Sequence, residues 1–126
     1  MYMVLSIAAG GACGAVLRHF SGMAALRLLG PDFPYGTLFV NVTGSFLMGL
    51  IIALFAHLGN PTQELRGFLT VGCLGAFTTF STFSLDVATL YEGGHMIGAA
   101  GYVLLSVALS ISALFIGMIL IRALTA

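Results

Sequence analysis

Four long apolar stretches dominate the chain, and short polar segments with glycine and proline separate them. The stretches cover residues 2–29, 37–57, 65–90 and 96–121. Each one reaches the roughly 20 residues that a helix needs to cross about 30 Å of hydrocarbon. The pattern therefore predicts an all-α integral membrane protein with four transmembrane helices, forming a single domain over residues 1–126 with no soluble module.

The composition agrees with this prediction. Of the 126 residues, 60% are hydrophobic and 6% are charged, and the mean hydropathy is +1.12. Such a chain has too little polar surface to coat a water-soluble globule. The first stretch lacks the basic start of a secretory signal peptide, so we expect it to be the first membrane helix. Cys13 and Cys73 lie within apolar stretches, where we expect small buried hydrophobic residues rather than a disulfide or ligands.

The positive charges give almost no preference for one orientation in the membrane. If both termini and the second connection share one side, that side carries Arg66 and Arg122. The other side carries Arg27, with Arg18 at the edge of the first helix. The positive-inside rule then has little to act on. Two alternatives remain open: dual insertion with pairing as an antiparallel dimer, or one fixed orientation.

Oligomerisation is expected because four thin helices leave little interior for an aqueous path. A transport pathway would have to form at or near a subunit interface. Small residues four positions apart support close helix contacts. The three such pairs are Gly10 with Gly14, Ser45 with Gly49, and Gly94 with Gly98.

Polar side chains at membrane depth need a partner or a function, since hydrocarbon provides neither. Asn41 lies one turn after Thr37 on the same helix face, and three hydroxyls recur every four residues along the fourth stretch: Tyr102, Ser106 and Ser110. Two interpretations remain open for these hydroxyls, hydrogen bonding within or between helices and lining of an ion path. The chain has no lysine. Neutral donors of this kind suit a small anion that must be bound and then released.

The segment GAFTTFSTFS, residues 75–84, is a poor helix sequence within the third stretch. Its Thr and Ser side chains compete for backbone hydrogen bonds, so we expect a broken helix at mid-depth. An unwound backbone is tolerated there only when it is buried in protein or lines a cavity, and its released carbonyls can bind a cation. Phe80 and Phe83 fall in this segment, and the positive rim of a phenyl ring can face an anion.

Three motifs carry a resemblance to a known family. The chain contains GACGAVLR at residues 11–18, GTLFVNVTGSF at residues 36–46 and GAFTTFSTFS at residues 75–84. In order and spacing they resemble the Fluc family of bacterial fluoride channels, also called CrcB proteins, over essentially the whole chain. The resemblance implies an antiparallel, dual-topology homodimer in the bacterial inner membrane. It also implies two pores along the dimer interface and passive, electrodiffusive export of fluoride from the cytoplasm, which confers fluoride resistance.

The resemblance further implies roles for individual residues. Asn41 would donate its amide to the ion, and Phe80 and Phe83 would form aromatic boxes beside the path. The other implied pore residues are the polar track of Tyr102, Ser106 and Ser110, with Thr37, Ser81 and Thr82 as further lining groups. The carbonyls of Gly75 and Thr78 would bind a central structural Na+ on the dimer axis, and Arg18 would support the vestibule electrostatically.

The main alternative function is a proton-coupled small multidrug exporter, which is also compatible with four helices and weak topology bias. Such an exporter needs an intramembrane acid, usually with aromatic surroundings. The first stretch has no Asp or Glu, and the chain has no Trp. Asp86, the only acid well inside a stretch, could pair with Arg18 or lie exposed at the membrane edge. We do not expect an enzyme, because no nucleophile, base and orienting partner form a recognisable set.

Overall fold

The computed structural model describes residues 1–59 and 61–126, and in these residues all regular structure is helical. The elements are α1 (Tyr2–Leu29), α2 (Tyr35–Leu58), α3 (Gln63–Arg66), the π-helix η1 (Gly67–Leu74), α4 (Gly75–Phe77), α5 (Ser81–Glu92) and α6 (Met96–Thr125). By length and composition, four helical spans can cross a membrane: Tyr2–Leu29, Tyr35–Leu58, Gln63–Glu92 and Met96–Thr125. The prediction of four transmembrane helices is confirmed.

The third span is the irregular one, as predicted, but its break is shorter than the sequence suggested. The chain leaves helical geometry only over residues 78–80, and Thr78 is extended at φ −89° and ψ 161°. Gly75 still belongs to α4 and Phe83 to α5. The hydroxyls of Thr78 and Ser84 each donate to the carbonyl four residues earlier, at 2.9 and 3.0 Å. A helix tolerates such bonds, so these two residues do not widen the break.

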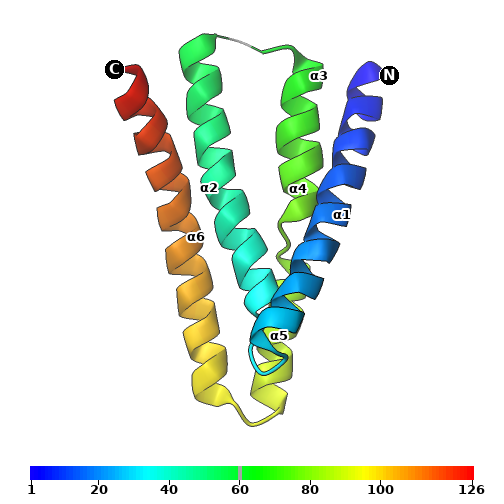
Figure 1. Ribbon diagram of the computed structural model, residues 1–126, viewed down its shortest axis with the longest axis vertical. Coiled ribbons are helices and arrows are strands. Elements are labelled where there is room, and N and C mark those ends of the chain that lie inside the picture. Colours follow the sequence, from blue (N-terminus) through cyan, green and yellow to red (C-terminus); the bar gives the residue numbers. More distant parts are fainter. Residues whose placement is uncertain (60) are drawn as a thin grey trace.

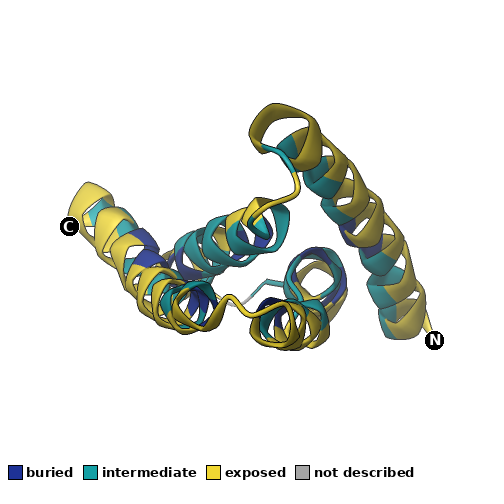
Figure 2. Ribbon diagram, turned by 90° about the horizontal axis from the view of Figure 1, so that it is seen from below, coloured by how far each residue is buried: buried dark blue, intermediate teal, exposed yellow. Residues whose placement is uncertain are grey.

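The spans form an open, fanned row rather than a closed bundle (Figures 1 and 2). Packing is most extensive between α2 and α6 and between α1 and η1, whereas α1 and α6 make no contact among the described residues. Both termini and the α2–α3 connection lie at one end of the molecule, and the α1–α2 loop and α5–α6 turn lie at the other (Figure 1). This arrangement is the one on which the charge argument was based.

Glycines allow the closest helix contacts, and the first predicted pair is confirmed. A Cβ added at Gly10 or Gly14 of α1 would collide with the backbone carbonyls of Phe68 or Cys73 in η1. Gly72 on η1 makes the reciprocal approach, because its added Cβ would lie 2.8 Å from the carbonyl oxygen of Ile7. The backbones of α1 and η1 are therefore in direct contact.

Of the other two predicted pairs, the one at Ser45 and Gly49 includes a close helix contact and the one at Gly94 and Gly98 does not. Gly49 of α2 packs against the Leu114 carbonyl of α6, and Gly117 of α6, which the spacing argument missed, packs against α2 in return. Gly94 and Gly98 make no close helix contact within the chain. Gly94 has φ +85° and open space around it, and the only neighbour near Gly98 is His95 of its own segment. Gly94 therefore serves the α5–α6 turn, where positive φ favours glycine.

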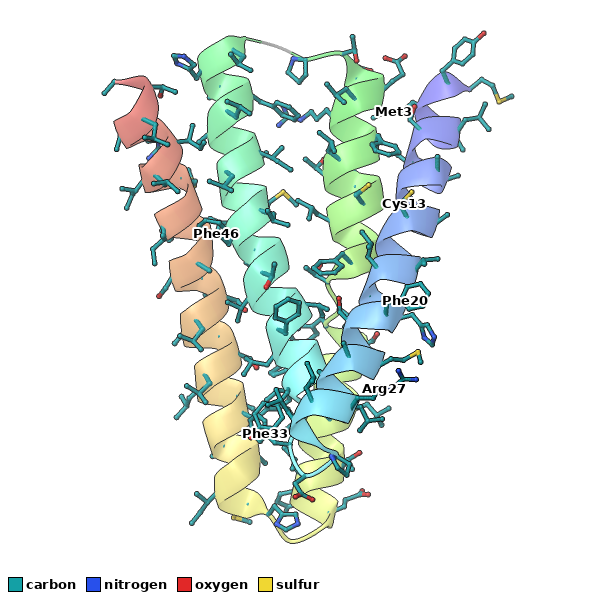
Figure 3. The ribbon with its side chains drawn as sticks, in the orientation of Figure 1. Met3, Cys13, Phe20, Arg27, Phe33 and Phe46 are labelled. Atoms are coloured by element: carbon teal, nitrogen blue, oxygen red, sulfur yellow. The ribbon has the colours of Figure 1, made fainter. Side chains whose placement is uncertain are left out.

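A single chain covers little of its own apolar surface. Between 11% and 22% of the residues in the most apolar part of each span are buried (Figure 2). Side chains point outward along much of each helix, as Phe20 and Arg27 illustrate (Figure 3), whereas Met3 packs against Gly67 of η1. Cys13 and Cys73 are free thiols, and Cys13 is exposed rather than buried as we expected, whereas Cys73 is half-buried. The outer faces are available to lipid or to another copy.

Candidate functional site

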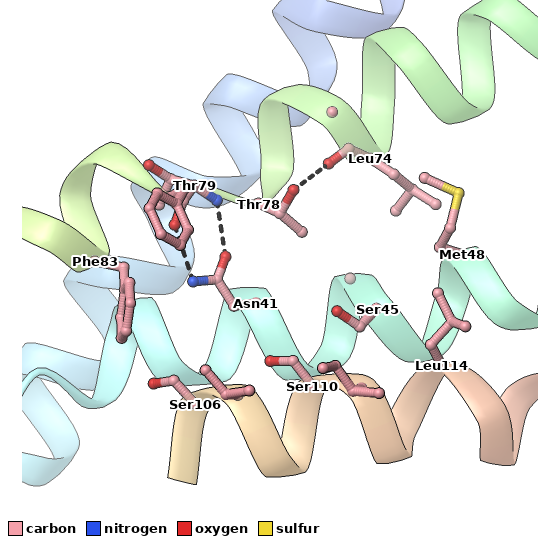
Figure 4. A pocket seen from close by; sticks show the side chains of 15 residues that line it. Asn41, Ser45, Met48, Leu74, Thr78, Thr79, Phe83, Ser106, Ser110 and Leu114 are labelled. Atoms are coloured by element: carbon pink, nitrogen blue, oxygen red, sulfur yellow. Dashed lines mark hydrogen bonds between the residues drawn. The ribbon is translucent and has the colours of Figure 1, made fainter. Parts of the chain in front are cut away.

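A cavity of about 400 Å³ lies beside the break in the third span, between α2 and α6 (Figure 4). Its lining comes from residues far apart in the sequence, because the break places the α4–α5 junction opposite both helices. The predicted site residues that line it are Asn41, Gly75, Thr78, Phe80, Phe83, Ser106 and Ser110. The fold therefore brings most of the predicted site together.

Two serine hydroxyls of α6 reach this cavity without a protein partner. Ser106 is buried and Ser110 is half-buried, and neither Oγ atom has a hydrogen-bond partner among the described residues. Their hydroxyls thus differ from those of Thr78 and Ser84, which bond to their own helix. A buried hydroxyl without a partner costs about 1–3 kcal/mol. Both serines line the cavity, and rotation of either side chain would present its free hydroxyl to a polar species there.

Aromatic rings form one wall of the cavity. The ring centroids of Phe80 and Phe83 lie 5.4 Å apart at 53°. Phe83 continues the row to Tyr102, at 5.1 Å, and the loop residue Phe33 meets Tyr102 edge to face at 5.4 Å. Phe83 is buried, but Phe80 is 76% exposed in the single chain. One face of the Phe80 ring is therefore open to a further partner.

Asn41 binds the backbone of the break at two points. Its Nδ2 donates to the carbonyl oxygen of Thr79 at 2.9 Å, and its Oδ1 accepts from the Thr79 N–H at 2.8 Å (Figure 4). In a continuous α-helix the Thr79 N–H would bond to the Gly75 carbonyl, so that carbonyl loses its helical donor. Sequence reasoning placed Asn41 in the site but missed these contacts, since no local pattern links residues 38 positions apart.

The Thr79 hydroxyl also contacts the first turn of the next helix. Its Oγ1 accepts a hydrogen bond from the Thr82 N–H at 3.2 Å, although the N-cap position of α5 itself belongs to Phe80, one residue later. The spacing of three residues between Thr79 and Thr82 is the sequence signal for this contact, since a Thr hydroxyl often accepts from an N–H three residues later. The Ser81 hydroxyl lies 3.4 Å from the same Thr79 oxygen. Ser81 itself is exposed and lines neither this cavity nor the second cavity described below.

A second cavity of about 430 Å³ lies on the other side of the break, between α1, α2 and the start of α5. It holds three predicted residues that the first cavity does not, namely Arg18, Thr37 and Thr82. Thr79 lines both cavities. The break therefore forms the partition between a space with a cationic side chain and a space with neutral hydroxyls.

Tyr102 and Asp86 form a pair that the sequence did not reveal. The Tyr102 hydroxyl donates to Asp86 Oδ2 at 3.0 Å, and Tyr102 is fully buried while Asp86 is half-buried. The hydrogen-bond partner of Asp86 is thus Tyr102 rather than Arg18. Tyr102 lies outside the first cavity, next to Phe83, whereas the other two residues of its stripe line the cavity.

Backbone oxygens are the candidate metal ligands at this site. In residues 1–59 and 61–126 no group of three or more His, Cys, Asp or Glu side chains could hold a metal ion. Gly75 and Thr78 both line the first cavity, and the carbonyl of Gly75 lacks its helical donor. Such carbonyls suit a hard cation without side-chain ligands.

The chain matches the family described as CrcB-like protein, Camphor Resistance (CrcB), over residues 5–118. Three similar proteins are each named fluoride-specific ion channel FluC. The protein from Rhodospirillum centenum is 53% identical over 97% of both chains. The one from Mesorhizobium japonicum is 50% identical over 98% of this chain and 99% of its own. The one from Rhodopseudomonas palustris is 55% identical over 92% and 94% respectively.

These findings confirm the resemblance that the three motifs suggested. The relatives are named as channels, not as enzymes, so the expectation that the chain is not an enzyme is also confirmed. With a family match across most of its length and relatives at half identity or more, this multi-pass membrane protein belongs to the CrcB (FluC) family.

Proposed function

We propose that the chain is a fluoride-selective channel through which F− leaves the cytoplasm passively, down its electrochemical gradient. The observation that carries this proposal is the pair of buried, unpartnered hydroxyls of Ser106 and Ser110 in a cavity with a phenylalanine wall. The relatives' name, fluoride-specific ion channel, supports the choice of ion. Export of this kind would protect the cell against fluoride.

The chemistry of the cavity suits this ion. Fluoride is small and strongly hydrated, so a path must replace its water with several hydrogen-bond donors. Ser106 and Ser110 supply hydroxyls, and Asn41 retains one amide N–H beyond the one that it gives to Thr79. The positive rims of Phe80 and Phe83 add further attraction. Because all these groups are neutral, the ion can be released again, and a narrow track would exclude the wider chloride ion.

The second cavity is the proposed vestibule. Arg18 raises the local concentration of anions there without lying among the neutral donors of the first cavity. Thr37 and Thr82 would bind the arriving ion, and Ser81 would do so from the exposed start of α5. Tyr102, held by Asp86 behind Phe83, would complete the polar track.

The path is incomplete in one chain, so we propose an antiparallel homodimer. Phe80 is largely exposed, and α1 and α6 do not meet around the first cavity. An inverted second copy would cover this open side, and twofold symmetry would then give two equivalent pores at the interface. The balanced arginines permit both orientations. Because the relatives come from bacteria and outer-membrane spans are β-strands, the inner membrane is the proposed location.

A structural Na+ at the centre of this dimer completes the proposal. Two carbonyls from each chain, those of Gly75 and Thr78, would hold it where the two breaks meet. When bound, the ion would supply fixed positive charge near both paths and link the chains. The protein's own part is to present these oxygens, which the break frees from helix bonding.

Flux from proteoliposomes separates this function from the proton-coupled exporter. Vesicles loaded with fluoride should release it rapidly when a potassium ionophore balances charge, and a protonophore should leave the rate unchanged. Release that requires a proton gradient, together with gradient-driven movement of a cationic dye, would favour the exporter. Asp86, whose Oδ2 accepts from the Tyr102 hydroxyl, is the carboxylate that the exporter would have to use for proton exchange.

A further inference from the structure

One amide side chain satisfies both polar backbone groups of the residue at the centre of the break. The Thr79 N–H and C=O both bind Asn41, at 2.8 and 2.9 Å. We infer that Asn41 is a positioning residue: its amide replaces the helix hydrogen bonds that the break removes and thereby sets where Phe80 and Phe83 stand. The inference rests on the proposed function only for its effect on flux, since the contacts themselves exist without an ion.

The pairing matches what a break inside a membrane requires. A peptide group without partners in hydrocarbon costs several kcal/mol, and water is not available to satisfy it. A side-chain amide offers one acceptor oxygen and a donor nitrogen in one plane, so it can bind an N–H and a C=O together. One of the two N–H groups of Asn41 is consumed in this way. Of the two amide N–H donors of Asn41, only one is therefore left for an ion.

The constraint continues from Thr79 into α5. With both backbone groups fixed, the Thr79 hydroxyl accepts from the Thr82 N–H and so sets the direction of the first turn of α5. That turn carries Phe83, which packs on Tyr102. Phe80 lies between Thr79 and this turn and packs on Phe83. A shift of Thr79 would thus move both rings of the cavity wall.

A second contact from α2 holds the neighbouring residue. Gly44 lies one turn after Asn41, and a Cβ added there would collide with the methyl group of Thr78. Successive turns of α2 therefore hold Thr78 and Thr79, the first by close approach and the second by hydrogen bonds. This places the α2 contacts on the break itself rather than on the helices beside it.

The inference differs measurably from a role as ion ligand alone. A residue that only binds the ion affects the backbone of the break when fluoride is bound. A positioning residue holds that backbone in place when fluoride is absent as well. The test is amide hydrogen exchange of residues 75–84 in fluoride-free nanodiscs. Asn41→Leu keeps the approximate size and removes both bonds, and Asn41→Asp, measured at a pH at which its carboxyl is ionised, keeps only the acceptor. Thr43→Val on the same helix, lining neither cavity, is the matched control.

We expect exchange in this segment to rise about tenfold or more in Asn41→Leu, since loss of about 1.4 kcal/mol corresponds to a tenfold change in an opening equilibrium. Asn41→Asp should lie between Asn41→Leu and the wild type, and Thr43→Val should match the wild type. Wild-type exchange in both Asn41 variants would overturn the inference. Should Asn41→Leu fail to fold, the comparison of Asn41→Asp with the wild type decides in the same way.

Flux gives the second measurement. In a double-mutant cycle with Phe83→Met, a residue that acts through the ring loses most of its effect once the ring is replaced. The Asn41→Leu change should therefore cost much less flux in the Phe83→Met background than in the wild type. Independent, multiplicative losses would contradict the inference. Absence of fluoride flux from the wild type would contradict the proposed function instead, and the exchange result would still stand.

Discussion

At the scale of the residue, the two unpartnered serines carry the strongest prediction. Ser106→Ala and Ser110→Ala should each slow fluoride efflux about five- to tenfold, because each removes one donor worth about 1–1.5 kcal/mol to the ion. Ser112→Ala is the matched control, since Ser112 lies on the same helix, is exposed and lines neither cavity. Efflux from vesicles with a fluoride electrode measures the effect. Equal rates for all three variants would remove the serines from the path.

The exposed ring gives a second prediction at this scale. Phe80→Ile should reduce fluoride efflux by at least tenfold, because an aliphatic side chain has no positive rim to face the ion. Dimer assembly, followed by size-exclusion chromatography, should be unchanged. Phe115→Ile on the exposed face of α6 replaces the same ring away from the cavities. A Phe80→Ile rate equal to that of this control would contradict a role for the ring.

Individual residues also show how far sequence reasoning can reach. Asn41, Phe83, Ser106 and Ser110 could be singled out from the sequence because polar or aromatic groups at membrane depth stand out in an apolar chain, and the fold brings them to one cavity. The partners of these groups were not predictable. The bonds from Asn41 to Thr79 and from Tyr102 to Asp86 join segments through tertiary packing, and no helix periodicity contains that information.

At the scale of the element, helix contacts through glycine should decide stability. Gly14→Val would place a branched side chain against the Cys73 carbonyl of η1 and should lower the melting temperature in detergent, at a cost of about 1–3 kcal/mol. Gly11→Ala, three residues away, meets no atom within 4 Å and favours the helix, so it should not lower the melting temperature. A Gly14→Val protein as stable as the Gly11→Ala protein would contradict this packing.

The elements were the most predictable part of the molecule. The first expected span has the observed bounds, and the others differ by a few residues at their ends, because apolar length is set by the membrane. The break was predicted too wide. Thr and Ser weaken a helix on average, but Thr78 and Ser84 bond to their own turns, and that outcome depends on local geometry. The π-helix η1 had no sequence signal and accompanies the close contact with α1.

At the scale of the whole molecule, balanced charges should produce both orientations in one membrane. In a variant without Cys13 and Cys73, a cysteine introduced by Ala126→Cys should react with a membrane-impermeant maleimide in about half of the chains in intact spheroplasts. Permeabilised cells should give complete labelling. Labelling of nearly all or of no chains before permeabilisation would mean one fixed orientation, and an antiparallel dimer would then be ruled out.

The proposed structural Na+ adds a prediction for the proposed dimer. Replacing Na+ by N-methylglucamine should lower both dimer stability and fluoride efflux, because four carbonyl oxygens would face one another without a cation. Return of Na+ should restore both. Thermal unfolding and efflux, each measured as a function of Na+ concentration, check this prediction. Curves that do not change with Na+ would remove the ion from the account.

The most direct test of the central claim compares two halides in the same vesicles. Purified wild-type protein in sealed proteoliposomes should release fluoride far faster than protein-free vesicles when valinomycin carries potassium, while chloride release should stay close to the protein-free rate. This result follows from a narrow track of neutral donors that can replace the water of fluoride. Fluoride release no faster than from protein-free vesicles, or equal release of both ions, would contradict the account.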